Sequence, residues 1–125
     1  MKRTVLTALL LIVVAVLAAA AGWWARGRAG APKLETTYQA VLLVNGQVYY
    51  GKLQGLGSAY PVMTDVYYVQ MGVDPATKQT KSVLLKRGNE WHSPDKMVLN
   101  ARQILMVEPV TSGSRVANLI AELKK

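Results

Sequence analysis

The sequence contains no cysteine, and this absence excludes several classes of site. It also has no phenylalanine and a single histidine, His92. Without cysteine the chain cannot form a disulfide framework, a thiolate metal site or a lipidated cysteine. A transition-metal site would need several carboxylates around one imidazole, and the seven acidic residues show no ligand spacing. We therefore expect no metal and no other cofactor.

Catalytic motifs are also missing. No Gly-rich phosphate loop follows a strand-like segment, and no Ser or Thr stands in a nucleophile motif. General acid–base catalysis needs positioned titratable pairs, and the sequence offers none. We therefore expect that the protein is not an enzyme.

Acidic residues are few, and the excess of basic residues is unevenly placed. Lys and Arg outnumber Asp and Glu by 15 to 7, for a formal net charge of +8. The first 33 residues hold five of the basic residues, namely Lys2, Arg3, Arg26, Arg28 and Lys33. The high charge therefore belongs partly to the flanks of an apolar segment, and it does not by itself indicate nucleic acid.

That apolar segment, Thr4 to Ala25, carries no charge. At about 1.5 Å per residue, twenty helical residues span the roughly 30 Å of a bilayer core. An aromatic pair followed by cations is typical of the membrane interface. The sequence therefore predicts a transmembrane signal-anchor over residues 1–25, with these interface residues: Trp23, Trp24, Arg26 and Arg28.

The alternative is a signal peptide that is cleaved within Ala18 to Ala21. The numbers of basic residues on the two sides of the segment are nearly equal, so the positive-inside rule does not decide its orientation in the membrane. Because a short N-terminus is usually retained inside the cell, we predict a single-pass protein of the cell membrane with an extracytoplasmic domain. Cleavage would instead release the domain as an exported protein.

The remaining sequence predicts a linker over residues 26–35, a β domain over 36–110 and an amphipathic helix over 111–125. Short strands with turn signals between them favour a closed or nearly closed small barrel of five to six strands. Asn45-Gly46 suits a type I′ turn and marks the clearest hairpin. The expected strands are Tyr38–Val44, Val48–Leu53, Val62–Met71, Ser82–Lys86, Met97–Leu99 and Ile104–Val110, with a bend over Asn100–Gln103.

The C-terminal segment has helical periodicity. Its apolar residues fall at i, i+3, i+4 and i+7, and they are Val116, Leu119, Ile120 and Leu123. Ser112 or Ser114 can cap the start of the helix. We expect the stripe to pack on the barrel; a helix that binds a partner is the alternative.

The loop from Gly88 to Asp95 is the best candidate for a binding site, because binding residues are concentrated on loops. Its candidate residues are Asn89, Glu90, Trp91 and His92. The alternative is a structural turn in which Trp91 covers the barrel end, His92 caps backbone groups and Pro94 fixes the chain.

Two tyrosine pairs, Tyr49-Tyr50 and Tyr67-Tyr68, lie on neighbouring predicted strands. Consecutive strand residues face opposite sides, so one tyrosine of each pair belongs to the core and the other to an outward stripe. Tyr50 and Tyr67 are the candidates for that binding surface. The alternative is that these residues form cross-strand pairs that stabilise the sheet.

The segment Val41 to Leu53 resembles the first half of the Sm-like motif, the family of the bacterial RNA chaperone Hfq. The shared features are the apolar run, the Asn-Gly turn and Gly51 before an apolar strand end. The segment from Lys96–Leu99 through Val107–Pro109, a strand, a tight bend and a strand that ends in Pro, is similar to the second half. The resemblance implies a strongly bent barrel of Sm or SH3-like type.

The RNA-contacting positions of that motif are not matched. Gly57, Ala59 and Pro61 replace the acidic, aromatic and polar residues, and Leu99-Asn100-Ala101 replaces the basic tripeptide. We therefore do not expect nucleic acid as a partner.

The layout is also similar to that of single-span, membrane-anchored bacterial proteins to which no activity is assigned. The matching segments are Tyr38–Val41, Asn45–Tyr49 with Gly51-Lys52, Val66–Tyr68, Gly88–Glu90 with His92 and Pro94, and Gln103–Leu105. This resemblance implies a shared architecture only.

The favoured hypothesis is a non-catalytic, membrane-tethered, extracytoplasmic binding or assembly module of the bacterial cell envelope. Its expected partners are the membrane and another envelope protein or polymer, and a second copy of the chain is a further option. The main alternative is a cytoplasm-facing, Sm-like protein that binds RNA or forms a ring. A scaffold subunit that docks through its C-terminal helix is a third.

Overall fold

The computed structural model describes residues 1–26 and 30–125. The predicted interface residue Arg28 lies outside them. The chain divides into two compact units, Met1–Ala31 and Pro32–Lys125, and each is described by itself.

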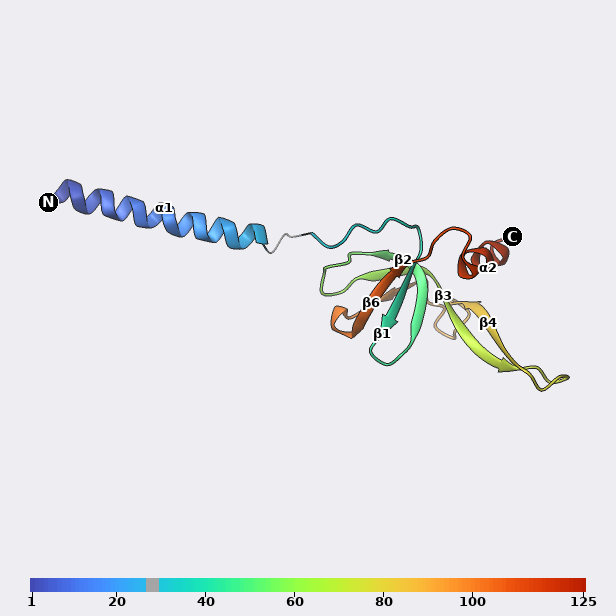
Figure 1. The fold of residues 1–125 in the computed structure, drawn as a ribbon. Helices are drawn as coiled ribbons and strands as arrows, with labels where there is room; N and C mark the ends of the chain where they lie inside the picture. The colour runs from blue at the N-terminus through green and yellow to red at the C-terminus, as the bar shows by residue number, and fades with distance from the viewer. Residues whose placement is uncertain (27–29) are drawn as a thin grey trace. The chain divides into compact units, whose positions relative to one another are not determined.

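The first unit contains one helix, α1 (Lys2–Arg26), as the uncharged run predicts (Figure 1). Its stretch Lys2–Trp24 is long and apolar enough to cross a membrane, with a mean hydropathy of 2.8. A signal sequence would have the same properties. The helix is therefore confirmed, while its retention and orientation stay predictions.

The second unit is an antiparallel sheet of six strands with one short helix. Along the hydrogen-bonded path the order is β4-β3-β2-β1-β6, and β5 pairs with β3. The elements are β1 (Gln39–Leu43), β2 (Val48–Gln54), β3 (Val62–Val73), β4 (Thr80–Lys86), β5 (Lys96–Val98), a 3-10 turn (Ala101–Gln103), β6 (Ile104–Pro109) and α2 (Arg115–Leu123). The mainly-β class is confirmed.

The predicted barrel closure is not found among the described residues. The 12-residue strand β3 is long enough to pair with two short strands in succession: Val62–Thr64 with β5, and Tyr67–Val73 with β4. Since β5 pairs with β3 and not with β6, the path ends at β4 and at β6. The sheet is therefore open in the described part of the chain.

The first hairpin forms where the Asn-Gly signal predicts it, but the turn type differs. Gly46 N–H donates to Leu43 O over 2.9 Å, and only Gly46 has a positive φ, of 83°. Three residues thus form the loop, a common alternative in which glycine takes the left-handed position after a type I turn. The type I′ prediction is wrong because Asn45 keeps a negative φ.

A β-bulge interrupts the pairing of β2 with β3. Thr64 pairs with Lys52 and Tyr67 with Tyr50, so Asp65 and Val66 together oppose Gly51. Asp65 has a φ of 51°, in the left-handed region. A Cβ on Gly51 would lie 3.0 Å from Thr64 O, which explains why glycine stands opposite the bulge.

The bulge produces two hydrophobic clusters on opposite faces of the sheet. Because it shifts the alternation, Met63 and Val66 both join the larger cluster, which also contains Val41, Leu53 and Leu99. Tyr67 belongs to the second cluster with Leu84 and Ile120. The face opposite the larger cluster is thus partly covered by α2.

Helix α2 confirms the predicted periodicity and packing. Ser114 caps it, its Oγ accepting from Ala117 N–H over 3.2 Å. Ile120 is buried, while Val116 and Leu119 pack half-buried against the cluster formed by Tyr67 and Leu84. Leu123, the last residue of the stripe, remains exposed.

Candidate functional site

The loop between β4 and β5 is held by a short internal network. Gly88 N–H donates to Glu90 Oε2 over 2.8 Å, and Arg87 Nε lies 3.1 Å from Glu90 Oε1. The hydrogen bond from Gly88 and the positive charge of Arg87 hold the pKa of Glu90 below its ordinary value. Glu90, one of the predicted site residues, thus fixes the loop from within.

This network presents Trp91 to solvent. The Trp91 side chain is fully exposed, at 104% of its reference area, and Asn89 and His92 are exposed beside it. Trp91 therefore does not cover the end of the sheet, as the structural alternative required. Tryptophan is among the residue types enriched at protein interfaces.

The tyrosines that border this loop are not the two candidates from the sequence. The Arg87 guanidinium lies 5.7 Å from the centre of the Tyr49 ring, and Tyr49 meets Tyr68 edge to face at 6.5 Å. A small hollow of about 130 Å³ lies between Arg87, Glu90, Tyr49, Tyr68 and Gln47. Tyr49 and Tyr68 thus join the loop on one face of the sheet.

Tyr50 and Tyr67 lie on the opposite face. Tyr67 is fully buried, and half-buried Tyr50 packs against the same cluster beneath α2. Tyr67 therefore has no exposed surface for an outward stripe, and the six candidate residues form two separate groups. The alternative that the tyrosines form cross-strand pairs is confirmed, since Tyr49 pairs with Tyr68 and Tyr50 with Tyr67.

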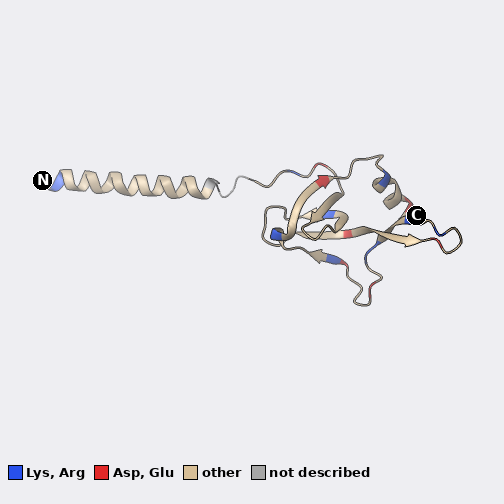
Figure 2. Ribbon diagram, turned by 60° about the horizontal axis from the view of Figure 1, so that its bottom comes forward, with Lys and Arg blue, Asp and Glu red and all other residues tan. Residues whose placement is uncertain are grey.

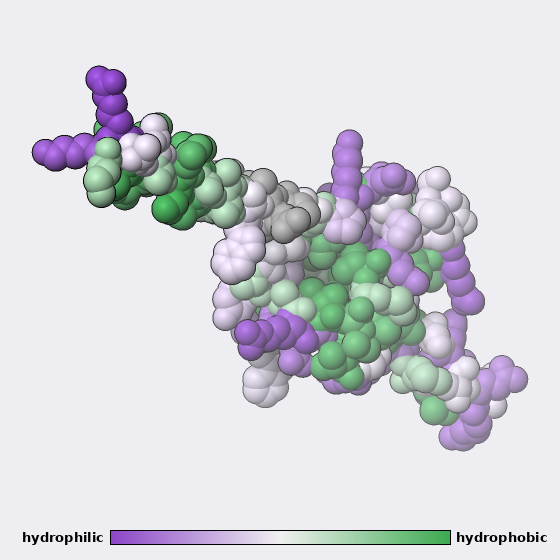
Figure 3. Space-filling model, turned by 60° about the vertical axis from the view of Figure 1, so that its left-hand side comes forward, coloured by the Kyte–Doolittle hydropathy of each residue, from purple (hydrophilic) through white to green (hydrophobic). Residues whose placement is uncertain are grey.

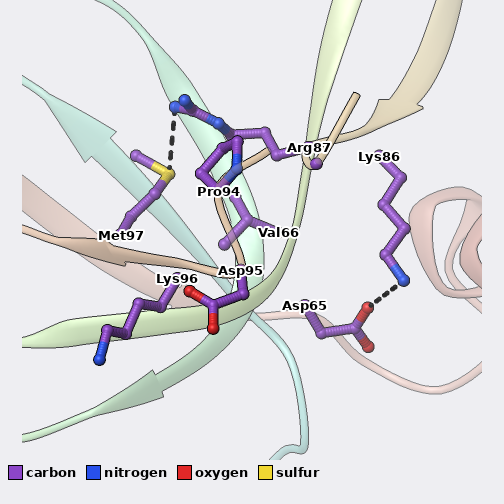
Figure 4. A pocket seen from close by; sticks show the side chains of 9 residues that line it. Asp65, Val66, Lys86, Arg87, Pro94, Asp95, Lys96 and Met97 are labelled. Atoms are coloured by element: carbon purple, nitrogen blue, oxygen red, sulfur yellow. Dashed lines mark hydrogen bonds and ion pairs between the residues drawn. The ribbon is translucent and has the colours of Figure 1, made fainter. Parts of the chain in front are cut away.

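A larger cavity, of about 370 Å³, lies between the bulge of β3, the end of β4 and the start of β5. Figure 4 shows Arg87 reaching toward Met97 and Lys86 reaching toward Asp65. Arg87 Nη1 is 3.4 Å from Met97 Sδ. Arg87 thus borders both hollows and supports the loop from the sheet side.

Asp65 is the centre of the most connected polar cluster in the sheet unit. Its carboxylate lies 2.7 Å from Lys124 Nζ and 3.4 Å from Lys86 Nζ. Both Tyr38 and Tyr67 donate hydroxyl hydrogen bonds to it, and Lys124 also donates to the Tyr38 hydroxyl. The cluster ties the C-terminal end of α2 to β3 and to the residue before β1.

The pKa values of this cluster follow from its contacts. Partial burial alone would raise the pKa of Asp65, but the hydrogen bonds from Lys124 and Tyr38 outweigh it and hold the pKa far below its ordinary range. Burial first, and then the Asp65 charge, raises the pKa of Tyr67 to about 12. The carboxylate is therefore ionised and both phenols are protonated at neutral pH. These states suit a structural role for the cluster of Asp65, Lys86, Lys124, Tyr38 and Tyr67, which is called the clasp below.

Sequence reasoning did not identify Asp65, Lys124 or Arg87 as site residues. One signal was present, since aspartate is depleted within strands and Asp65 stands among strand-forming residues. The contact with Lys124 joins residues 59 positions apart (124 minus 65). No local pattern reports such a contact.

No group of three or more His, Cys, Asp or Glu residues that could hold a metal occurs in the described part of the chain. The chain matches no protein-family model, and no curated protein matches it. The candidate site therefore depends on its own geometry: an exposed tryptophan on a loop fixed by Arg87 and Glu90.

Substitution of Glu90 by Gln tests whether the loop network is formed as described. We expect faster exchange of the Gly88 amide hydrogen, because the neutral amide accepts a weaker hydrogen bond and loses the ion pair with Arg87. Hydrogen exchange read by mass spectrometry measures this change. Asp95→Asn, in the same loop, is the control; an unchanged Gly88 rate in Glu90→Gln would contradict the network.

Proposed function

We propose that the protein is a non-catalytic binding or assembly module of the bacterial cell envelope, tethered to the membrane by α1. The sheet unit contacts another envelope protein or polymer through the loop Gly88–Asp95. The observation that carries this proposal is the complete exposure of Trp91. Exposure of so much apolar surface is unfavourable in water, and contact with a partner would remove it.

The loop geometry supports the same proposal. Trp91 follows directly on Glu90, whose carboxylate is fixed by Gly88 and Arg87. A preorganised loop loses less conformational entropy on binding than a mobile one. Tryptophan is also one of the residue types most enriched among those that dominate binding energy.

A photocrosslinking amino acid in place of His92 tests the proposed partner surface. We expect a discrete crosslinked product from intact cells that is lost when Trp91 is also replaced by Ala. Gln54, at an exposed position at the end of β2, is the control site for the crosslinker. The same products from both sites, or none from His92, would contradict the proposal.

Trp91→Ala is also expected to leave folding stability nearly unchanged. Because the ring is fully exposed, its removal should alter the free energy of unfolding by less than about 0.5 kcal/mol. Denaturant titration of the full chain in detergent micelles measures this value. A loss of several kcal/mol would show that Trp91 has a structural role and is not free to bind.

The orientation of the sheet unit needs a separate test. With the domain outside the cytoplasm, protease added to intact spheroplasts should degrade a C-terminal tag while a cytoplasmic marker survives. Survival of the tag until lysis would instead place the domain inside. Cleavage of α1 would be visible as a shortened chain that is released from the membrane fraction.

No observation favours the cytoplasm-facing, Sm-like alternative. Figure 2 shows Lys and Arg distributed over loops, strands and α2 of the sheet unit, with acidic residues among them. Nucleic-acid binding uses basic residues that are clustered on one face.

A further inference from the structure

We propose that the distal part of the β3–β4 hairpin is a second membrane contact, which lies on anionic lipid headgroups. This part, called here the β3–β4 ribbon, comprises residues 69–83. The inference depends on the proposed tethering by α1, and it adds a lipid surface to the partners of the sheet unit.

The ribbon extends beyond the rest of the sheet (Figure 1). Pairing of β2 with β3 ends at Tyr49 and Tyr68, whereas pairing of β3 with β4 continues to Val73 and Thr80. The end of the ribbon is therefore two-stranded, with no third strand beside it. Its side chains are not needed to build the sheet.

One face of the β3 strand in this ribbon is nevertheless apolar. Val69, Met71 and Val73 are exposed by 44%, 70% and 63%, and their alternation places them on one face of β3. Neither hydrophobic cluster of the sheet unit contains them. In water the exposed stripe does not stabilise the ribbon, whereas contact with a lipid surface would bury it.

The ribbon as a whole carries a small positive charge, because Lys78 and Lys81 outnumber Asp74. Lys78 is exposed in the turn. Lys81 is exposed as well, but it pairs with Gly72 and therefore lies on the face opposite the apolar stripe, from which its long side chain can extend past the edge of the ribbon. The Asp74 carboxylate accepts hydrogen bonds from Ala76 N–H and Thr77 N–H. Figure 3 shows hydrophobic and hydrophilic side chains next to each other on this part of the molecule, at the lower right. Apolar residues beside lysines are the composition that anionic bilayers bind.

The tether keeps the ribbon near a bilayer. Twelve residues, 27–38, separate the end of α1 from the start of β1, and a fully extended chain of this length reaches at most about 45 Å. A soluble partner must diffuse to the ribbon, whereas the membrane that holds α1 is always within reach. This proximity makes the lipid surface the occupant that the observations favour.

The absence of cysteine allows a direct test in the full chain. Met71→Cys provides a single labelling site for a polarity-sensitive fluorophore, and Gln54→Cys provides the matched exposed control. Each variant is reconstituted into vesicles that contain anionic lipid, with and without brominated lipid as a quencher. We expect a blue-shifted emission and quenching by brominated lipid at position 71 and neither effect at position 54.

Charge reversal supplies the second arm. The double substitution Lys78→Glu and Lys81→Glu, or the use of purely zwitterionic vesicles, should reduce the quenching at position 71 by about half or more. Water-like emission at position 71 in a chain that remains in the vesicles would overturn the inference alone. Emission at position 71 that responds to protein density but not to brominated lipid would indicate a second copy and also overturn it. A chain that does not float with the vesicles would overturn both the tether and the inference.

Discussion

Asp65→Asn is expected to lower the free energy of unfolding at neutral pH by about 2 kcal/mol. The Asp65 side chain is only 16% exposed, and it is the shared acceptor for Lys124, Lys86, Tyr38 and Tyr67. Asparagine retains the left-handed backbone conformation and a hydrogen-bond acceptor, so this variant removes mainly the charge. The expected loss of stability is smaller than for a fully buried ion pair, because both lysines are about half exposed.

Asp65→Ala should cost more, about 3 kcal/mol, because it also leaves two tyrosine hydroxyls without an acceptor and disfavours the positive φ. Urea titrations of the full chain in detergent micelles, with tyrosine and tryptophan fluorescence as the readout, measure both values. Lys124→Ala and Lys125→Ala form the matched control pair, since only Lys124 contacts the carboxylate. Equal stabilities for Asp65→Asn and the unmodified chain would refute the clasp.

The same cluster predicts a dependence of stability on acid pH. The pKa of Asp65 is lower in the folded state than its ordinary value of 3.8. Stability from this group is therefore fully present above about pH 4 and is lost as the pH falls toward the folded-state value. The stability difference between the unmodified chain and Asp65→Asn should shrink steadily below pH 4. A difference that is constant from pH 7 to pH 3 would show that the charge contributes nothing.

Local sequence signals predicted the strands because each one depends on its own alternation and on the turn beside it. Asn45-Gly46 located the first hairpin. Barrel closure was not predictable in this way. It depends on which strand the three-residue β5 pairs with, and that choice depends on the length and bulge of β3.

The candidate site was likewise predictable where it depends on local sequence and not where it depends on contacts between strands. The sequence located the Gly88–Asp95 loop, because an indole and an imidazole among turn-forming residues are visible locally. It could not assign the tyrosines to faces, since the bulge at Asp65 changes the alternation between Met63 and Tyr67. Alternation also does not say which side of the sheet α2 covers, and Tyr67 packs with Ile120 of that helix.

The other large effect is expected from Ile120→Ala, which should lower the free energy of unfolding by about 3 kcal/mol. Ile120 is 3% exposed and packs with Tyr67 and Leu84, so the shorter side chain leaves a cavity between α2 and the sheet. Looser packing of α2 would also disturb the ion pair between Lys124, at the end of this helix, and Asp65.

Leu123→Ala, three residues later on the same helix, is the matched control. Leu123 is 55% exposed, and its removal should cost less than about 1 kcal/mol. Urea titration gives both values, and hydrogen exchange across α2 shows whether the helix separates from the sheet before the strands unfold. Similar small losses for the two variants would mean that α2 is only loosely held, and its apolar stripe would then be available to a partner. A large loss for Ile120→Ala alone would establish the stripe as part of the hydrophobic core and leave the Gly88–Asp95 loop and the β3–β4 ribbon as the surfaces for binding.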